Sequence, residues 1–376
     1  MKDTMAIIFA YQRTEQMKAL TEMRSLPSVP FGGRYRIIDF ALSNIVNSGI
    51  TKVGIITRNS YQSLMDHLGS GKPWDLNRKN DGLFVLPPFF MGADDGGELY
   101  RGKMDALMNA ESFIRRSNHK YVLLATANAV FNMTYDAALA YHEEKEADIT
   151  IIYKKGSFPR DGGVFDGETF LHTDETGRVT DVSIDPLVGR EKLSTGQIII
   201  GKSLLETLMW ECKSRSAFNL TTDVLQRRVK DLRIYGYEYD GLYLPVSTVN
   251  SYYDANMALL DADVRGELLL GGDKIYTKVH DDVPSLYLEG SDVTNSLISD
   301  GCIIQGKVEN SILSRNVRVR PGAVVKNCII LHSCEVQAGA HLECVIADKN
   351  TVIRENTQVI SNRIYPMVIP KGTVVG

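Results

Sequence analysis

A chain of 376 residues is longer than one ordinary domain of about 100 to 200 residues, so we expect two domains. Hydrophobic residues make up 44% and charged residues 23% of the chain, which is ordinary for a globular protein and argues against disorder. The formal charge of -4 predicts neither a nucleic-acid partner nor a membrane partner. Any anionic ligand must therefore be held by a local group of cations.

The cysteines and the first residues of the chain indicate the cellular compartment in which the protein is expected. Five cysteines at irregular spacing form no C-x-x-C pair, which argues against a disulfide framework or a zinc site. The apolar run that ends at Phe9 is too short for a signal peptide, and no run reaches the roughly 18 apolar residues of a membrane span. We expect a soluble, cytoplasmic protein.

Up to about residue 240, short β-branched runs alternate with helix-patterned segments, which is typical of an α/β domain with a largely parallel sheet. The expected strands are Ala6 to Phe9, Lys52 to Thr57, Tyr121 to Leu124, Asp148 to Tyr153 and Gln197 to Ile200. Apolar residues at three- and four-residue spacing predict the helices. These are Ile37 to Asn47, Lys103 to Arg116, Tyr135 to Glu144 and Ser203 to Glu211.

After about residue 290 the helical pattern disappears and apolar residues return every six positions. The three series are Leu313, Val319, Val325 and Leu331; Val324, Ile330, Val336 and Leu342; and Ala340, Ile346 and Val352. A six-residue period is typical of a parallel β-helix, and an ordinary antiparallel β-domain is the alternative. We therefore divide the chain into an α/β domain (1–246), a linker with a helix (247–289) and a β-helix (290–376).

Residues 27–44 read P-S-V-P-F-G-G-R-Y-R-I-I-D-F-A-L-S-N. This segment closely resembles P-A-V-P-F-G-G-K-Y-R-I-I-D-F-x-L-S-N of bacterial glucose-1-phosphate adenylyltransferases, also called ADP-glucose pyrophosphorylases. Further matching segments lie at residues 47–50, 71–76, 86–88, 100–102 and 255–257. The resemblance covers essentially the whole chain. It implies a Rossmann-like nucleotidyltransferase domain followed by a left-handed parallel β-helix.

In that family, the oxygen of glucose-1-phosphate attacks the α-phosphorus of ATP, and pyrophosphate leaves with the help of Mg²⁺. A glycine-rich loop with an arginine holds the nucleotide phosphates. By the resemblance, this loop falls on residues 10–17, which read A-Y-Q-R-T-E-Q-M here. Tyr11, Gln12 and Thr14 replace the glycines, Gln16 replaces the arginine, and Glu15 adds a negative charge. An ordinary strand-to-helix turn is the simpler interpretation of this loop.

The positions that the resemblance assigns to the metal and to the sugar phosphate are also changed. Asn128 stands where the family has the aspartate of G-D-H, and Pro245 and Asn250 replace both acids of D-V-G-T-I-D. Because Mg²⁺ prefers carboxylate oxygens, the resemblance implies that Mg²⁺ binding is lost. Asp185 replaces the lysine that pairs with the glucose-1-phosphate phosphate, which reverses the charge there. We therefore expect no catalytic residues and no cofactor.

Three residues match family positions on the sugar side, namely Ser194, Gly196 and Asp223. They are candidates for vestigial sugar-phosphate binding. The alternative is that Ser194 starts a strand and Asp223 caps a turn or faces solvent.

Arg24, Arg34, Arg36 and Lys52 form a basic set around the turn Phe31 to Gly33, where the family places part of its activator-binding region. The three arginines are the candidates for binding an effector or another anion. Arginine suits a phosphorylated effector because its planar fork binds phosphate with two hydrogen bonds. The family's lysine of A-K-P is Leu26 here, so part of that pocket is missing. The alternative is surface arginine, or arginine paired with Asp39.

His332 and His341 lie in the repeat, where the β-helix of some acyltransferases carries a catalytic histidine. This chain has no acyltransferase-like loop insertion beside either histidine. We therefore expect both to be solvent-exposed surface residues.

Within the family, the closest resemblance is to the GlgD-type, non-catalytic subunit. This resemblance implies a regulatory subunit that raises the activity of a catalytic GlgC-type chain in a heterotetramer, with a phosphorylated sugar as a candidate effector. Two alternatives stay open. One is a weakly active sugar-phosphate nucleotidyltransferase, and the other is a purely structural or binding module.

Overall fold

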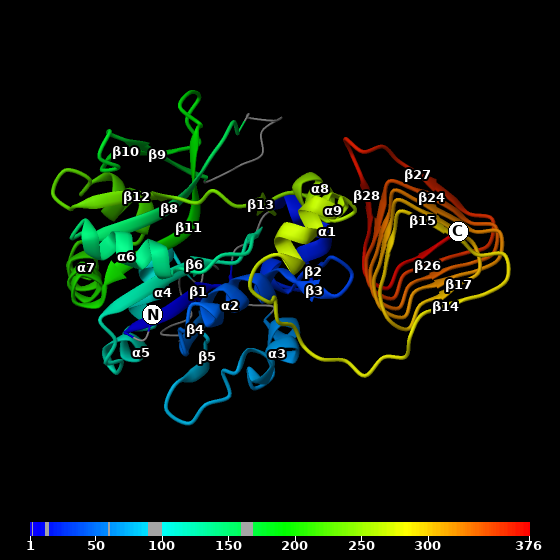
Figure 1. The fold of residues 1–376 in the computed structure, drawn as a ribbon, viewed down its shortest axis with the longest axis horizontal. Helices are drawn as coiled ribbons and strands as arrows, with labels where there is room; N and C mark the ends of the chain where they lie inside the picture. Colours follow the sequence, from blue (N-terminus) through cyan, green and yellow to red (C-terminus); the bar gives the residue numbers. More distant parts are fainter. Residues whose placement is uncertain (2, 12–14, 59–60, 89–99, 159–167) are drawn as a thin grey trace.

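The computed structural model describes residues 1, 3–11, 15–58, 61–88, 100–158 and 168–376. Figure 1 shows an α/β unit on one side and a β-helix on the other, with α1, α8 and α9 between them. The prediction of an α/β domain followed by a parallel β-helix is confirmed. The limits 1–246, 247–289 and 290–376 stay a prediction.

The α/β unit is built on a sheet that has nine strands in the described residues. Seven of them follow one another in the order β10-β9-β11-β6-β1-β4-β5. The other two are β8, which pairs with β11, and β12, which pairs with β8. The neighbouring strands β6, β1, β4 and β5 are parallel to one another, with β5 at the edge of the sheet. The strands are β1 (Thr4–Phe9), β4 (Lys52–Ile56), β5 (Gly82–Leu86), β6 (Tyr121–Thr126), β8 (Ile149–Lys155), β9 (Thr169–Thr173), β10 (Val179–Ile184), β11 (Lys192–Gly201) and β12 (Ile234–Glu238).

The expectation of a largely parallel sheet is wrong for one half of this sheet. β11 is antiparallel to β6 and to β8, and β9 and β10 form an antiparallel hairpin. The hairpin turns at Gly177, whose φ of 85° suits glycine. An apolar run predicts a strand but not its direction, and antiparallel neighbours need only a short connection. The sheet is therefore mixed.

Helices cover both faces of the sheet, and α1, α8 and α9 lie between the sheet and the β-helix (Figure 1). They are α1 (Lys18–Thr21), α2 (Ile37–Asn47), α3 (Gln62–Leu68), α4 (Lys103–Asn109), α5 (Glu111–Arg115), α6 (Asp136–Glu144), α7 (Lys202–Ser214), α8 (Val249–Ala258) and α9 (Ala262–Arg265). The expected helix from Lys103 to Arg116 is divided at Ala110, whose φ of -93° and ψ of 6° are not helical. None of the helices in the described ranges combines the length and the apolar character needed to cross a bilayer.

Alternate residues of β1 point to opposite faces of the sheet, and each face has its own apolar core. Met5, Ile7 and Phe9 pack into the core that α4, α5 and α7 complete. Ala6 and Ile8 pack into the core under α2, α3 and α6. The strand is thus buried on both faces, which explains its almost continuous apolar sequence.

The β-helix stacks its strands in three parallel sheets of six, five and five strands. The strands are β14 (Leu286–Tyr287), β15 (Asp292–Thr294), β16 (Leu297–Ile298), β17 (Ile303–Ile304), β18 (Lys307–Glu309), β19 (Ile312–Leu313), β20 (Arg318–Val319), β21 (Val324–Lys326), β22 (Ile329–Ile330), β23 (Glu335–Val336), β24 (His341–Glu343), β25 (Val345–Ala347), β26 (Val352–Ile353), β27 (Gln358–Ile360), β28 (Met367–Ile369) and β29 (Val374–Val375).

The six-residue period is interrupted once in each central coil. Leu313, Val319 and Val325 face the inside, but the next inward residue is Ile330, five positions on. Asn327, with a φ of 51°, forms the tighter corner between them. Leu331, which we expected in the same series, instead faces the α/β unit. Each such coil therefore spans 17 residues, as the pairing of Val319 with Val336 shows.

The two units meet across a buried apolar cluster and a buried ion pair. Leu26 and Tyr252 of the α/β side pack with Leu331 and other residues of the β-helix. Beside them, the guanidinium of Arg24 and the carboxylate of Asp348 form an ion pair, and the two residues are 4% and 1% exposed. This contact ties the coil that ends at Asp348 to the segment after α1.

We predict that Asp348→Asn destabilises the protein by about 3–5 kcal/mol, because it leaves the charge of Arg24 buried without its carboxylate. Urea unfolding measures the change. Asp75→Asn is the matched control, because Asp75 is 84% exposed in its ion pair with Arg78 and exposed pairs contribute about 0–1 kcal/mol. Equal stabilities for the two variants would contradict a structural role for the buried pair.

Candidate functional site

The sheet topology places a crevice at the carboxyl ends of β1 and β6. The chain runs from β1 to β4 and β5 on one side, and then crosses to β6 on the other side of β1. Ligands of open α/β sheets bind at such a switch point. The residues that follow these strand ends are Ala10 and Tyr11 after β1, and Ala127 and Asn128 after β6. The positions identified from the sequence therefore lie where a ligand would bind.

Tyr11 fills space at the first position that the resemblance assigns to a glycine of the phosphate loop. Its ring centroid lies 5.1 Å from that of Tyr100 and 6.0 Å from that of Phe9, and burial raises the pKa of its phenol. A close backbone approach to phosphate needs a residue without a side chain. Gln12, Thr14 and the side chain of Glu15 lie outside the described residues.

Asn128 and Pro245 lie together at the end of β6. The hydroxyl of Thr126 donates to Oδ1 of Asn128 over 2.9 Å, and the Asn128 carbonyl accepts from the Val246 amide over 2.7 Å. Pro245 pairs with Ala129 where β13 (Leu244–Pro245) meets β7 (Ala129–Val130). The side chains at both positions are uncharged. Among the described residues, no three His, Cys, Asp or Glu side chains are grouped so that they could hold a metal ion.

Ser194 and Gly196 form a bulge of β11 beside the same strand end. The hydroxyl of Ser194 accepts from the Gly196 amide over 3.2 Å. Gly196 has a φ of 77°, and an added Cβ would lie 2.2 Å from Oγ1 of Thr126. The structure therefore brings Ser194 and Gly196 close to Asn128, and the glycine is required by backbone conformation and by space. Their sugar-binding role stays a prediction.

Asp185 lies in an environment that disfavours a phosphate. Its carboxylate is 3.9 Å from Nη1 of Arg190, whose Nε already donates to the Phe158 carbonyl over 2.8 Å. Burial and the charge of Asp185 raise the pKa of Glu168 to about 7, while Arg190 acts in the opposite direction. The carboxyl groups of Asp185 and Glu168 lie near the guanidinium of Arg190, which already donates a hydrogen bond to the Phe158 carbonyl. The electrostatic potential here is therefore too weakly positive to attract a sugar phosphate.

Asp223 has a structural use in the described chain. Its Oδ2 accepts from the backbone amides of Phe218 and Asn219 over 3.0 and 2.9 Å, and its Oδ1 is 3.3 Å from Arg227. These contacts close the turn before the helical segment η4 (Leu220–Gln226). Asp223 thus caps a turn, which is the alternative interpretation from the sequence, and its sugar-binding role stays a prediction.

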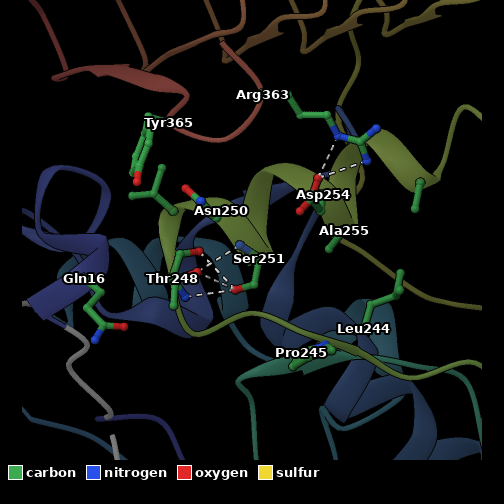
Figure 2. A pocket seen from close by; sticks show the side chains of 12 residues that line it. Gln16, Leu244, Pro245, Thr248, Asn250, Ser251, Asp254, Ala255, Arg363 and Tyr365 are labelled. Atoms are coloured by element: carbon green, nitrogen blue, oxygen red, sulfur yellow. Dashed lines mark hydrogen bonds and ion pairs between the residues drawn. The ribbon is translucent and has the colours of Figure 1, made fainter. Parts of the chain in front are cut away.

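Three of the replaced positions surround one pocket of about 770 Å³ between the two units (Figure 2). Gln16 comes from the 3-10 helix η1 (Glu15–Met17), Pro245 from β13 and Asn250 from the first turn of α8. Arg363 and Tyr365, from the loop between β27 and β28, complete the opposite wall. The sequence analysis did not indicate that the loop between β27 and β28 contributes to this pocket.

Asn250 joins α8 to the β-helix. Its Nδ2 donates to the carbonyl of Ile364 over 2.5 Å, and in the next turn of α8 the carboxylate of Asp254 is 3.2 Å from Arg363. A carboxylate at position 250 has no proton to donate and would repel the carbonyl oxygen. The amide at this position therefore has a structural function that an acid could not perform.

A second constellation, the interdomain cation group, consists of Arg24, Arg36, Arg315 and Lys349, with the neutral His332 beside them; the charges of these residues act on one another. The guanidinium of Arg36 donates to the carbonyl and hydroxyl oxygens of Ser63 over 2.6 and 3.0 Å, and burial lowers its pKa to about 10. Two of the three predicted anion-binding residues thus lie in the group. Arg34 is exposed, and its carbonyl accepts from Arg315 over 3.3 Å.

The sequence analysis missed Arg315 and Lys349, and it considered His332 only as a surface residue. They are 17 residues apart, one full coil each, so they form a column on the β-helix. Backbone bonds from Ser333 to Arg315 and from Asn350 to His332 confirm the stacking. The expectation that His332 is solvent-exposed is wrong, because the residue is half-buried and its Nδ1 is buried. A search at period 17 instead of six would have aligned these three positions.

The chain matches two protein families. Residues 5–262 match the nucleotidyl transferase family, and residues 285–364 match the GlmU-like C-terminal hexapeptide family. The chain therefore belongs to the nucleotidyl transferase family, with a hexapeptide-repeat unit at its carboxyl side.

Comparison with individual proteins shows which members of the nucleotidyl transferase family this chain is similar to. The chain is 33% identical to the glycogen biosynthesis protein GlgD of Bacillus subtilis over 96% of its own length and 93% of that protein. It is 31% identical to the glucose-1-phosphate adenylyltransferase of Desulforamulus reducens, over 95% and 89% of the two lengths. It is 36% identical to the enzyme of the same name from Thermomicrobium roseum, over 91% and 84%.

We predict that Asn250→Asp loosens the loop between β27 and β28, because the carboxylate repels the Ile364 carbonyl. Trypsin cleavage after Arg363 should become faster by roughly 2- to 10-fold, as expected for the loss of about one hydrogen bond. Asn118→Asp, at an exposed position between α5 and β6, is the control with the same change of charge. An unchanged cleavage rate would show that the bond does not hold the loop.

Proposed function

We propose that this chain is a non-catalytic, regulatory subunit of bacterial glucose-1-phosphate adenylyltransferase. It acts beside a catalytic homologue of the GlgC type, in a heterotetramer that makes ADP-glucose for glycogen. The similarity over nearly the whole chain to GlgD and to glucose-1-phosphate adenylyltransferases supports this assignment.

The observation that carries the proposal is the neutral chemistry at the metal and phosphate positions. Gln16, Asn128, Pro245 and Asn250 carry no charge, and phosphoryl transfer depends on charge neutralisation and positioning. At about 10²-fold for each missing group, the losses lead to near inactivity, although groups that act as a unit are not additive. We therefore propose that no Mg²⁺ is used in this crevice.

The regulatory part of the proposal relies on the interdomain cation group. Four cations lie near one another there, and carboxylates pair with two of them, Asp348 with Arg24 and Asp282 with Arg315. Guanidinium and ammonium groups of this kind suit a phosphorylated sugar effector. Arg24 and Arg36 of the α/β unit and Lys349 of the β-helix are its proposed contacts.

We predict that the purified chain alone makes no measurable ADP-glucose from ATP, glucose-1-phosphate and Mg²⁺, because the charges that the reaction needs are missing. Added to the catalytic chain of the same genome, it should raise kcat or change the response to phosphorylated effectors. Rapid turnover by the chain alone would support the alternative of an active nucleotidyltransferase. Unchanged kinetics of the mixture would support a purely structural module.

We predict that Asn128→Asp combined with Pro245→Asp restores less than about 1% of the partner's turnover, since Tyr11 and Gln16 still replace a glycine and an arginine of the phosphate loop. The assay of the chain alone measures this. Adding Tyr11→Gly and Gln16→Arg to the pair should increase activity further. Turnover near that of the partner after the first two changes would contradict the importance of the loop.

A further inference from the structure

A cavity of about 440 Å³ opens on the surface of the α/β unit, and we call it the tyrosine cavity. Its residues come from α6, β8, β12 and the turn between β9 and β10, at the end of the α/β unit that is farther from the β-helix (Figure 1). The lining includes three tyrosines and three carboxylates, namely Tyr141, Tyr153, Tyr237, Glu175, Glu238 and Asp240. None of the described residues that line the cavity is a lysine or an arginine. The cavity therefore combines aromatic rings with acidic groups.

The tyrosine rings at this cavity are inclined to one another. The ring centroids of Tyr141 and Tyr237 are 5.6 Å apart, with an angle of 60° between the ring planes. Tyr235, the next tyrosine along β12, has its ring centroid 6.4 Å from that of Tyr141 at an angle of 83°. A sugar ring stacks best on one flat aromatic surface, whereas inclined rings can surround a compact cation and attract it through their electron-rich faces. The geometry of the rings therefore favours a cation over a sugar.

Two glycines make room for the tyrosine rings. Gly236 lies inside β12, where a glycine weakens a strand and often marks the close approach of another group. A Cβ at Gly236 would lie 2.9 Å from Cε1 of Tyr153. A Cβ at Gly177 would lie 2.5 Å from the hydroxyl oxygen of Tyr141. The positions of both rings thus depend on residues without a side chain.

The carboxylates make the electrostatic potential at these rings negative. Oε2 of Glu238 accepts from the Tyr153 hydroxyl over 3.1 Å. Burial, followed by the charge of Glu238, raises the pKa of the Tyr153 phenol, and Asp240 adds to this. In the part of the chain that the structure describes, Glu175, Glu238 and Asp240 form no ion pair with a lysine or an arginine. Lys154 donates to the backbone carbonyl of Asp240 over 2.7 Å, so its bond leaves the carboxylate available to a ligand.

Lysines of the protein itself lie over the faces of two of these rings. Nζ of Lys145 is 5.6 Å from the ring centroid of Tyr141, and Nζ of Lys192 is 5.6 Å from that of Tyr153. An ammonium group is attracted to a tyrosine face up to about 6 Å from the centroid. Neither lysine lines the cavity. The two contacts support a ligand of the same chemistry inside the cavity.

We propose that the tyrosine cavity binds an organic ammonium group, which is either one end of a polyamine or the lysine side chain of a partner protein. The ammonium group lies against the faces of Tyr141 and Tyr237, and the carboxylates of Glu175, Glu238 and Asp240 supply the opposite charge. No covalent bond forms or breaks. The inference goes beyond the proposed function, because none of these residues belongs to the crevice or to the interdomain cation group.

Isothermal titration of the whole chain with spermidine tests the proposal, and maltose is the neutral ligand that a sugar site would prefer. We expect a Kd of about 0.1–5 mM for spermidine, as suits partly exposed cation–π contacts and carboxylates. The affinity should fall as salt is added, because exposed charges are screened. Nα-acetyl-lysine amide distinguishes the two sources of the ammonium group. Tighter binding of spermidine favours a polyamine, and tighter binding of the lysine amide favours a partner protein.

Paired charge variants locate the binding. Glu175→Gln combined with Glu238→Gln should weaken spermidine binding by about 3- to 30-fold, because it removes two opposing charges. A glutamine at position 238 still accepts from the Tyr153 hydroxyl, so the ring keeps its hydrogen bond. Glu289→Gln combined with Glu355→Gln, at exposed positions of the β-helix, is the control with the same change of net charge. This control pair should leave the affinity unchanged.

An aromatic variant tests the role of the rings separately from that of the charges. Tyr141→Leu keeps an apolar side chain but removes the electron-rich face, so it should weaken spermidine binding by about 2- to 5-fold. Tyr287→Leu, at a tyrosine of β14 that is 51% exposed, is the matched control and should bind as the parent does.

Three outcomes would overturn the inference. The first is that neither spermidine nor the lysine amide binds at low salt. The second is an equal loss of affinity in the two pairs of glutamate variants, which would mean that the acidic protein attracts cations without a site. The third is maltose binding that Tyr141→Leu abolishes, which would make the cavity a sugar site. The effect of the chain on a catalytic partner is measured independently of all three.

Discussion

The position of the β-helix relative to the α/β unit depends on the buried ion pair between Arg24 and Asp348. This pair fixes one coil of the β-helix against the segment that follows α1, beside the apolar cluster that contains Tyr252 and Leu331. A buried charge needs its partner, so this contact tolerates little movement. The charge of Arg36 acts on two residues of the column in the β-helix, His332 and Lys349.

The positions that the resemblance assigns to metal and phosphate have neutral side chains or structural contacts in this chain. The amide of Asn128 accepts from Thr126, and the amide of Asn250 donates to the backbone of the β-helix. Tyr11 packs against aromatic rings where a glycine would be needed for phosphate. These contacts stabilise the fold without requiring a cation. The crevice is thus consistent with a chain that keeps the architecture of a nucleotidyl transferase without its charges.

Much of the fold could be predicted because local sequence controls it. The helix from Ile37 to Asn47 has the predicted limits, and the inward positions Leu313, Val319 and Val325 follow the repeat. The direction of β11 could not be predicted, because strand direction depends on pairing with β6 and β8 across the sheet. Sequence patterns within one strand contain no such information.

The interdomain cation group was predicted only in part, because its members come from distant parts of the chain. Arg24 and Arg36 lie close in sequence to a recognisable turn, whereas their partners come from coils about 300 residues away. The corner at Asn327 shortens one repeat from six residues to five, so a search at period six separates Arg315, His332 and Lys349. Asn250 was identified as a lost acid, but its bond to Ile364 depends on the packing of the two units.

The most direct test of the central claim uses a complex in which the catalytic partner carries an asparagine in place of its own metal-binding aspartate. Every remaining active crevice would then have to belong to this chain. The account predicts that this complex forms and makes no measurable ADP-glucose, while the complex with the intact partner is active. ADP-glucose synthesis by the complex with the inactivated partner would contradict it.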